Sequence, residues 1–256
     1  MPNTPSAELL TSADVERRTS SFNARRALLK SNPSLFVSRT RLSVRQIPTF
    51  VTERMLKRLA SHAVKAFELE VRQDSRQPLT ADELSRGEEL SGVVEDGDVV
   101  EMDKQKKDKN KSKFKGRDTG VKQAKIVRQA ERVDTLTGKG RSKGYGFIEM
   151  HKHTDALRLL RWANNNPEVG TLFDVWWKDE LENLFKLEKS KPESERDDTR
   201  IKRLKEEIDK GDDGKKKSKG SLIVEFSIEN IQITKRRYAS QAAAVSKKFL
   251  FVGVHF

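Results

Sequence analysis

Residues 142–150, SKGYGFIEM, form a glycine-rich run with a strong preference for β structure. Successive side chains of a strand point to opposite faces of a sheet, so Tyr145 and Phe147 share one face while Ile148 points to the other. If Ile148 enters a core, the two rings and Lys143 stand on a face that other elements leave open. This pattern favours a fold that exposes one side of its sheet.

The periodicity of apolar residues predicts six elements outside two highly charged stretches. TRLSVRQI, from Thr40, alternates as a half-buried strand, and a helix capped by Thr52 follows it. VKQAKIVRQ, residues 121–129, and the glycine-rich run predict two further strands, and a helix capped by Thr154 comes next. SLIVEFSI, residues 221–228, predicts the last strand. The apolar face expected for the second helix consists of Ala156, Leu157, Leu160 and Ala163.

The order strand, helix, strand, strand, helix, strand predicts an α+β fold of the ferredoxin-like type, with a four-stranded antiparallel sheet and two helices on one face. We expect a basic helical or linker arm over residues 1–39, a single domain over 40–237 and a tail over 238–256. The domain is interrupted by insertions at about 68–120 and about 166–220.

The two insertions differ in composition. Residues 82–103 hold nine acidic side chains and one arginine, and residues 104–117 hold eight basic ones. Such blocks bury too little apolar surface to offset chain entropy, which predicts disorder. The second insertion has apolar residues at helical spacing, and Trp176 and Trp177 are expected to pack its first helix. Because adjacent tryptophans should not both be buried on one helical face, one of them is a candidate for docking a protein partner.

Overall composition favours a polyanionic partner. The 256 residues carry a net charge of +13, which suits nucleic acid or an anionic membrane surface. No apolar run approaches the ~20 residues of a membrane-spanning helix, and the first 30 residues lack a hydrophobic signal centre. The absence of cysteine is compatible with a reducing compartment, so we expect a soluble intracellular protein without membrane association.

The glycine-rich run also resembles a known family. KGYGFIEM, residues 143–150, is similar to the ribonucleoprotein octamer [KR]-G-[FY]-[GA]-F-V-x-[FY] of the RNA-recognition motif, with departures at Ile148 and Met150 on the inward side. LSVRQI, residues 42–47, resembles the partner hexamer, although Ser43 stands where the family has a stacking ring. Exposed rings beside cations suit single-stranded RNA, because bases stack on the rings and cations meet phosphates. The candidate RNA-binding residues are Lys143, Tyr145, Phe147, Arg41, Ser43, Arg45, Lys125, Lys235, Arg236 and Arg237.

A narrower resemblance covers residues 31–67 and 121–237, including both insertion points and the phrase LRW at 160–162. These segments resemble the last RNA-recognition motif of the nucleolar multi-motif proteins that assist assembly of the large (60S) ribosomal subunit. The resemblance implies a protein of the nucleus and nucleolus that binds precursor ribosomal RNA (pre-rRNA) within pre-60S particles, beside other assembly proteins. Members of that family are longer and carry several motifs, so we expect a fragment, a truncated form or a divergent short relative.

Two alternatives share this fold. A protein-interaction scaffold in pre-ribosomal particles is favoured by Ser43 in place of a ring and by the tryptophan-bearing insertion. An RNA-recognition-motif protein of messenger RNA processing would use the same chemistry, because a fold does not decide its target. The lysine-rich segments 104–117 and 215–219 are either solvated tails or contribute to nuclear import or nonspecific RNA contact.

No catalytic motif is present in the sequence. It contains no phosphate-binding loop, no nucleophile elbow and no cysteine nucleophile, so we predict a protein that is not an enzyme and that uses no cofactor or small-molecule substrate. His151 and His153 lack the further ligands that a metal site needs. The apolar run FLFVGVHF, residues 249–256, does not fit the rest of the chain, and we hypothesise that it derives from intron read-through.

Overall fold

The computed structural model describes residues 11–88, 120–134, 136–209, 221–237 and 239–240. The helices and strands are, in chain order, α2 (Ser12–Ser31), β1 (Leu35–Arg45), α3 (Glu53–Arg72), α4 (Ala81–Glu88), β2 (Val121–Val133), β3 (Gly140–Met150), α5 (His153–Ala163), α6 (Glu168–Lys189), α7 (Asp198–Asp209) and β4 (Ile223–Asn230). Within these described segments no helix is long and apolar enough to cross a membrane.

Two compact units make up the chain: the described residues before 40 and after 225 form one, and those between 40 and 225 form the other. Strands β1 and β4 each run from one unit into the other. The larger unit contains β2, β3, helices α3 to α7, the last part of β1 and the first part of β4.

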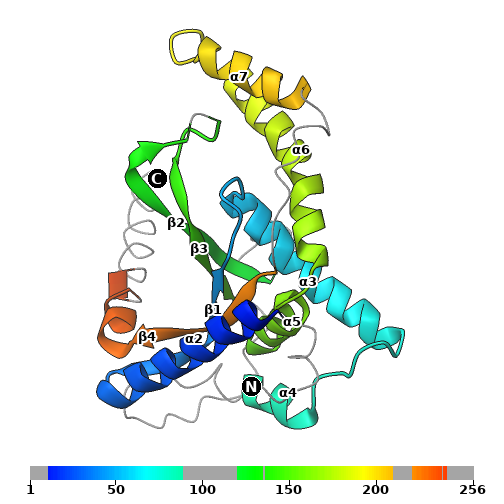
Figure 1. Ribbon diagram of the computed structural model, residues 1–256, viewed down its shortest axis with the longest axis vertical. Coiled ribbons are helices and arrows are strands. Elements are labelled where there is room, and N and C mark those ends of the chain that lie inside the picture. The colour runs from blue at the N-terminus through cyan, green and yellow to red at the C-terminus, as the bar shows by residue number, and fades with distance from the viewer. Residues whose placement is uncertain (1–10, 89–119, 135, 210–220, 238, 241–256) are drawn as a thin grey trace, which may run out of the picture. The chain divides into compact units, whose positions relative to one another are not determined.

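The four strands form one antiparallel sheet in the order β2-β3-β1-β4. Strand β3 pairs with β1 on one side and with β2 on the other (Figure 1). With α3 between β1 and β2 and α5 between β3 and β4 along the chain, the arrangement is βαββαβ. The predicted α+β fold of the ferredoxin-like RNA-recognition motif is therefore confirmed.

Helices α3 and α5 pack against each other and against the sheet of the larger unit. Thr52 caps α3 as predicted, because its hydroxyl oxygen accepts a hydrogen bond from the Met55 N–H at 3.3 Å. The core side chains of the sheet and the two helices are Leu42, Val44, Ile126, Ile148, Met150, Met55, Leu56, Leu59, Phe67, Ala156 and Leu159.

The start and the buried face of α5 differ from the prediction. The helix begins at His153 after a Lys152 N-cap that makes no side-chain capping bond, so Thr154 is not the cap. Its buried residues are Ala156, Leu159, Trp162 and Ala163, whereas the predicted Leu157 and Leu160 are half-buried at its margins. The helix is rotated in this way because it buries the Trp162 ring against His62 of α3, with ring centroids 5.3 Å apart.

The asparagine run after α5 joins the two ends of the second insertion. The Asn165 N–H donates to the Leu222 carbonyl at 3.0 Å, and the Ser221 hydroxyl donates to Asn165 Oδ1 at 2.6 Å. The Val224 N–H donates to Asn164 Oδ1 at 3.1 Å. These bonds hold the end of α5 beside the start of β4, so the insertion between them leaves and rejoins the sheet-bearing domain at one place.

Both tryptophans of the second insertion are buried, at 5% and 9% exposure for Trp176 and Trp177. The expectation that one of them stays exposed is therefore wrong. Adjacent helical positions point about 100° apart, and here the two rings meet two different neighbours. Trp176 packs edge-on to His62 with centroids 5.6 Å apart, and Trp177 packs on Phe50 at 5.3 Å. A hydrogen bond from Thr52 to the buried Glu180, 2.8 Å long, adds a polar contact between α6 and the start of α3.

The first insertion is helical in part. Helix α3 continues to Arg72, and residues 81–88 form α4, so the prediction of disorder is wrong for these two segments. Helix α4 packs against α5, and Arg161 of α5 forms an ion pair with Glu83 of α4. Most of the acidic run and the basic run 104–117 lie outside the described residues.

The smaller unit holds α2, the first part of β1 and the last part of β4. Thr11 caps α2, because its hydroxyl oxygen accepts a hydrogen bond from the Asp14 N–H at 3.2 Å. Arg25 of α2 donates to the Phe226 carbonyl of β4. Residues 231–237, which follow β4, are helical, and the Ile231 N–H donates to the Ser34 carbonyl at 3.0 Å.

At Gly146 the backbone of β3 lies close to the backbone of β2. A Cβ atom at this position would lie 2.5 Å from the Lys125 carbonyl oxygen, which is far inside van der Waals contact. We expect Gly146→Ala to lower the free energy of unfolding by about 1–3 kcal/mol, because the two backbones would have to separate. Urea unfolding measures this difference.

Val133→Ala provides the control for that substitution. Val133 lies on the same hairpin but is 63% exposed, and its truncation should change the free energy of unfolding by less than about 0.5 kcal/mol. Equal stability of Gly146→Ala and the wild-type chain would contradict the close approach.

Candidate nucleic-acid interface

The outer face of the sheet, opposite α3 and α5, is built by alternation along three strands. On β1, Arg41, Ser43 and Arg45 alternate with the buried Leu42 and Val44. The same rule places Tyr145, Phe147 and Glu149 of β3 and Lys125 of β2 on this face, because their strand neighbours are buried.

The strand register arranges these residues in rows across the face. Lys125 of β2 is paired with Phe147 of β3, and Phe147 is paired with Ser43 of β1. Tyr145 is paired with Arg45 in the next row. Six of the seven predicted residues of the larger unit therefore belong to one surface. The seventh, Lys143, lies on the part of β3 that adjoins this surface.

The two aromatic rings differ in accessibility. Tyr145 is 38% exposed, whereas Phe147 is half-buried. The Arg41 guanidinium lies over the Phe147 ring, 4.7 Å from its centroid. Such a cation–π contact contributes about 0.5–1 kcal/mol at an exposed site. The Tyr145 ring is thus accessible, and one side of the Phe147 ring is covered by the long side chain of Arg41.

Two carboxylates border the rings, and each is paired with a cation. Arg45 contacts Glu225 of β4 with 2.7 Å between Nη2 and Oε2. Lys122 contacts Glu149 with 2.7 Å between Nζ and Oε1. Ser43, which stands where a stacking ring was expected, donates its hydroxyl to the Glu225 carbonyl at 3.2 Å. Ser43 therefore ties β1 to β4 and offers no aromatic surface.

Lys125 and Lys143 are exposed, and no ion pair joins either of them to another described residue. Because each bordering carboxylate is already matched by Arg45 or Lys122, these lysines give the surface an excess of positive charge. An exposed cation next to a ring is the arrangement that a nucleotide uses, with its base on the ring and its phosphate on the cation.

The glycines of this segment serve the backbone. Gly146 is buried and its missing side chain faces the Lys125 carbonyl, so it does not provide space beside the rings. Gly144 has φ +79°, a left-handed conformation that glycine adopts without strain, and its carbonyl accepts the Ile47 N–H at 2.9 Å.

The basic group after β4 belongs to the other unit. Lys235 and Arg236 are exposed on the helical residues 231–237. Arg237 forms an ion pair with Glu229 at 3.0 Å between Nη2 and Oε1. These three cations therefore lie in the smaller unit, and the segment 215–219 lies outside the described residues.

Lys122 and Glu149 were missed by the sequence analysis. Glu149 occupies the variable position of the octamer, and only alternation from Phe147 could have placed it on the outer face. Lys122 lies within the shift in register between Val121 and Gln123, so simple alternation along β2 gives the wrong face for it. Within the described part of the chain, no three His, Cys, Asp or Glu residues gather as metal ligands.

The sheet order defines the class of fold, an α+β fold of the βαββαβ type that is consistent with a ferredoxin-like RNA-recognition motif. No protein-family profile matches the chain, and no solved structure matches it. A curated protein that it resembles is human RNA-binding protein 28, which is 26% identical over 166 residues. The match covers 65% of this chain and 15% of that protein, so the similarity concerns a small part of a much longer molecule.

The hairpin that carries Lys125 and Tyr145 is anchored to α3 by Glu53. Arg128 of β2 donates to both Glu53 carboxylate oxygens, at 2.9 and 3.2 Å, and Lys139 donates to Oε2 at 3.1 Å. Burial alone would raise the pKa of Glu53, but the hydrogen bonds from Arg128, from its own backbone N–H and from Lys139 outweigh it and lower the pKa to about 2.

This ion pair makes stability depend on acid pH. A carboxyl group whose pKa is lowered in the folded state stabilises the fold above its unfolded pKa and loses this effect as it is protonated. We expect Glu53→Gln to lower the free energy of unfolding at pH 7 by about 1 kcal/mol, after allowance for partial exposure. The difference from wild type should shrink as pH falls from about 4.5 towards about 2. Denaturant unfolding across this range measures it.

Glu131→Gln serves as the matched control, because Glu131 is an exposed glutamate on the same hairpin. A difference between Glu53→Gln and wild type that stays constant down to pH 2 would contradict the assigned role of the Glu53 carboxylate.

Proposed function

We propose that the chain is an RNA-binding protein that grips single-stranded or looped RNA on the outer face of its sheet, without catalysis. The observation that carries this proposal is the row of Lys125, Phe147 and Ser43 next to the row of Tyr145 and Arg45. One base would stack on Tyr145 and another on Phe147, while Lys125 and Lys143 neutralise phosphates. The similarity to a protein named for RNA binding supports the same conclusion.

The energies favour a base over the resident arginine at Phe147. Stacking of a base on a ring contributes about 1–3 kcal/mol, compared with about 0.5–1 kcal/mol for an exposed cation–π contact. A base can therefore displace the Arg41 guanidinium, which lies 4.7 Å from the ring centroid in the free chain. The displaced guanidinium would then be available to a phosphate, so Arg41 would exchange one role for the other on binding.

The footprint proposed for this surface is short. Ser43 donates to the Glu225 carbonyl and provides no third ring, and Glu225 itself places a carboxylate at that edge of the surface. Two stacked bases flanked by cations fit this geometry better than an extended run of bases. Arg45 remains with Glu225 in this arrangement and holds the edge of the sheet.

We further propose that the RNA is pre-rRNA bound during 60S subunit assembly in the nucleolus, beside other pre-60S proteins. The support is the resemblance of residues 31–67 and 121–237 to the last motif of the nucleolar assembly family. The similarity to human RNA-binding protein 28 supports RNA binding in general. Mapping of protein–RNA crosslinks in cells tests this target: crosslinks to messenger RNA alone, or none within 143–147, would oppose it.

A protein-interaction scaffold loses one of its two supports. The tryptophan pair of α6 packs inside the chain, against Phe50 and His62, and offers no exposed aromatic surface to a partner. Ser43 in place of a ring is the support that stays with this alternative.

Removal of both rings tests stacking directly. We expect Tyr145→Ala/Phe147→Ala to weaken binding of a single-stranded RNA oligonucleotide by about thirtyfold or more, because two stacking contacts are lost. Fluorescence anisotropy titration measures the change.

The control variant is Phe185→Ala on α6, where Lys189 lies over a half-buried phenylalanine ring as Arg41 does over Phe147. It should bind RNA like the wild type. Equal affinities of the double variant and the wild type would reject base stacking on these rings.

The lysines should set the salt dependence. Each phosphate neutralised on a single strand contributes about 0.7 to the slope of log affinity against log salt concentration. We expect Lys125→Gln/Lys143→Gln to reduce that slope by about 1.4, whereas Lys202→Gln/Lys205→Gln, exposed lysines on α7, should leave it unchanged. A slope that falls equally in both double variants would indicate contact by general charge only.

A further inference from the structure

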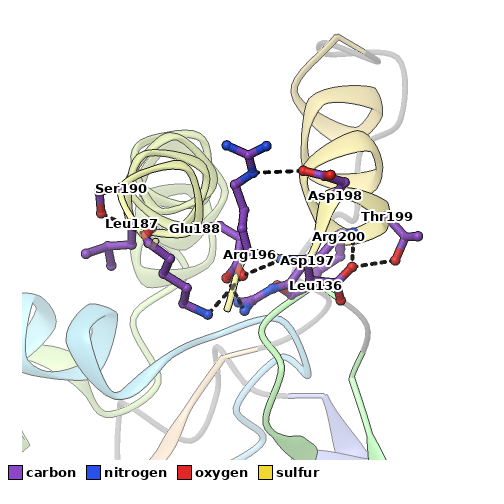
Figure 2. Close-up of polar contacts among 10 residues, drawn as sticks. Leu136, Leu187, Glu188, Ser190, Arg196, Asp197, Asp198, Thr199 and Arg200 are labelled. Atoms are coloured by element: carbon purple, nitrogen blue, oxygen red, sulfur yellow. Dashed lines mark hydrogen bonds and ion pairs between the residues drawn. The ribbon is translucent and has the colours of Figure 1, made fainter. Parts of the chain in front are cut away.

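The loop between β2 and β3, described at residues 134 and 136–139, is held by bonds among these residues and by an arginine from the second insertion. Inside the loop, the Asp134 N–H donates to the Lys139 carbonyl at 2.7 Å, and the Gly138 N–H donates to the Asp134 carbonyl at 2.9 Å. From α7, Arg200 Nε donates to the Leu136 carbonyl at 3.0 Å (Figure 2). This bond joins the loop to a residue 64 positions further along the chain.

Arg200 fits closely against the loop. Its side chain is 17% exposed, and a Cβ atom at Gly138 would lie 3.2 Å from its Cζ atom. Gly138 has φ +67°, a conformation that favours glycine. The Arg200 guanidinium therefore packs on the loop backbone at Leu136 and Gly138. Little room remains there for another side chain.

A buried carboxylate fixes the guanidinium in place. Glu188 of α6, with a side chain 3% exposed, contacts Arg200 Nη1 at 2.6 Å and Lys191 Nζ at 2.9 Å. It also accepts the Asp197 N–H at 3.3 Å. The pKa of Glu188 is lowered, first by the hydrogen bond from Lys191. Burial acts in the opposite direction, and the Asp197 N–H bond and the positive charge of Arg200 lower the pKa further. Figure 2 shows these groups converging between α6 and α7 above the loop.

The backbone of Arg200 is fixed as well. The Asp197 carboxylate accepts the Arg200 N–H at 3.0 Å and the Thr199 hydroxyl at 2.6 Å, which caps the first turn of α7. At the other end of the hairpin, Trp176 of α6 packs on His62 of α3, and Trp177 packs on Phe50, which precedes α3. The α6–α7 hairpin is thus a rigid support that starts on α3 and reaches the β2–β3 loop.

We propose that the α6–α7 hairpin braces the β2–β3 loop and that Arg200 is the positioning residue of this brace, which sets how the adjoining end of β3 is presented to RNA. Two exposed cations, Arg141 and Lys143, follow the loop directly on β3, so the orientation of the loop decides where they project. Glu53 holds the same hairpin through Arg128 and Lys139, and the two anchors together leave the loop little freedom. This role in binding rests on the proposed RNA function.

Arg200→Lys separates the two contacts of the guanidinium. Lysine keeps the positive charge beside Glu188, but its single nitrogen cannot reproduce the fork that meets both the carboxylate and the Leu136 carbonyl. We expect hydrogen–deuterium exchange of the Gly138 and Lys139 amides to become about three- to tenfold faster, while the amides of 201–209 in α7 exchange as in the wild type. Arg203→Lys, an exposed arginine one turn along α7, is the control and should change neither.

RNA binding is measured on the same three proteins with one single-stranded oligonucleotide. We expect Arg200→Lys to dissociate about threefold faster or more, and Arg203→Lys to match the wild type. Unchanged exchange in the loop, or equal acceleration in the loop and α7, would overturn the brace whether or not RNA binds. Faster loop exchange with unchanged dissociation would overturn only the positioning role. A wild-type chain that binds no oligonucleotide would overturn the proposed function and this role together, while the exchange data would still decide the brace.

Discussion

The close approach of β3 to β2 at Gly146 is the constraint on which the rest of the structure depends. With no side chain at this position, the Lys125 carbonyl lies close to the central strand, and Phe147 can pair with Lys125 of β2 on one side and with Ser43 of β1 on the other. That register decides the two faces of the sheet. It sends Ile148 into the core with Leu42 and leaves Phe147 on the outer face, so core packing and surface chemistry have the same cause.

Charge on the outer face is organised by pairing. The carboxylates of Glu149 and Glu225 each hold one cation, and these pairs tie strands together across the face. The two carboxylate side chains are 7% and 24% exposed, and their pairing with cations neutralises negative charge that would repel a polyanion. Lys125 then remains exposed beside Phe147, and Arg41 covers one side of that ring. A surface of this kind is polar, and it still leaves the Tyr145 ring 38% exposed.

The insertions show how polar segments can become part of a fold. Helix α6 buries two large rings, one against His62 of α3 and the other against Phe50 before α3, which offsets the entropy of ordering a highly charged hairpin. At the end of the hairpin away from these rings, the buried Glu188 carboxylate forms ion pairs with Arg200 and Lys191. An unmatched carboxylate at that depth would be strongly destabilising, so the ion pairs are a condition of the packing and not an addition to it.

Much of the fold could be predicted from the sequence, because strand alternation and helical periodicity are local properties. They located every strand of the sheet and both helices that cover it, and the octamer placed Tyr145 and Phe147 on one face. They did not locate the exact face of α5, which depends on Trp162 meeting His62, nor the burial of both Trp176 and Trp177, which depends on two neighbours distant in the chain. The sequence by itself determined the order of elements and the alternation of side chains. Only the tertiary structure decided which cations are paired, why the glycines are needed and what holds the β2–β3 loop, because each of these results from atoms that come within a few ångströms only after residues far apart in the chain have packed together.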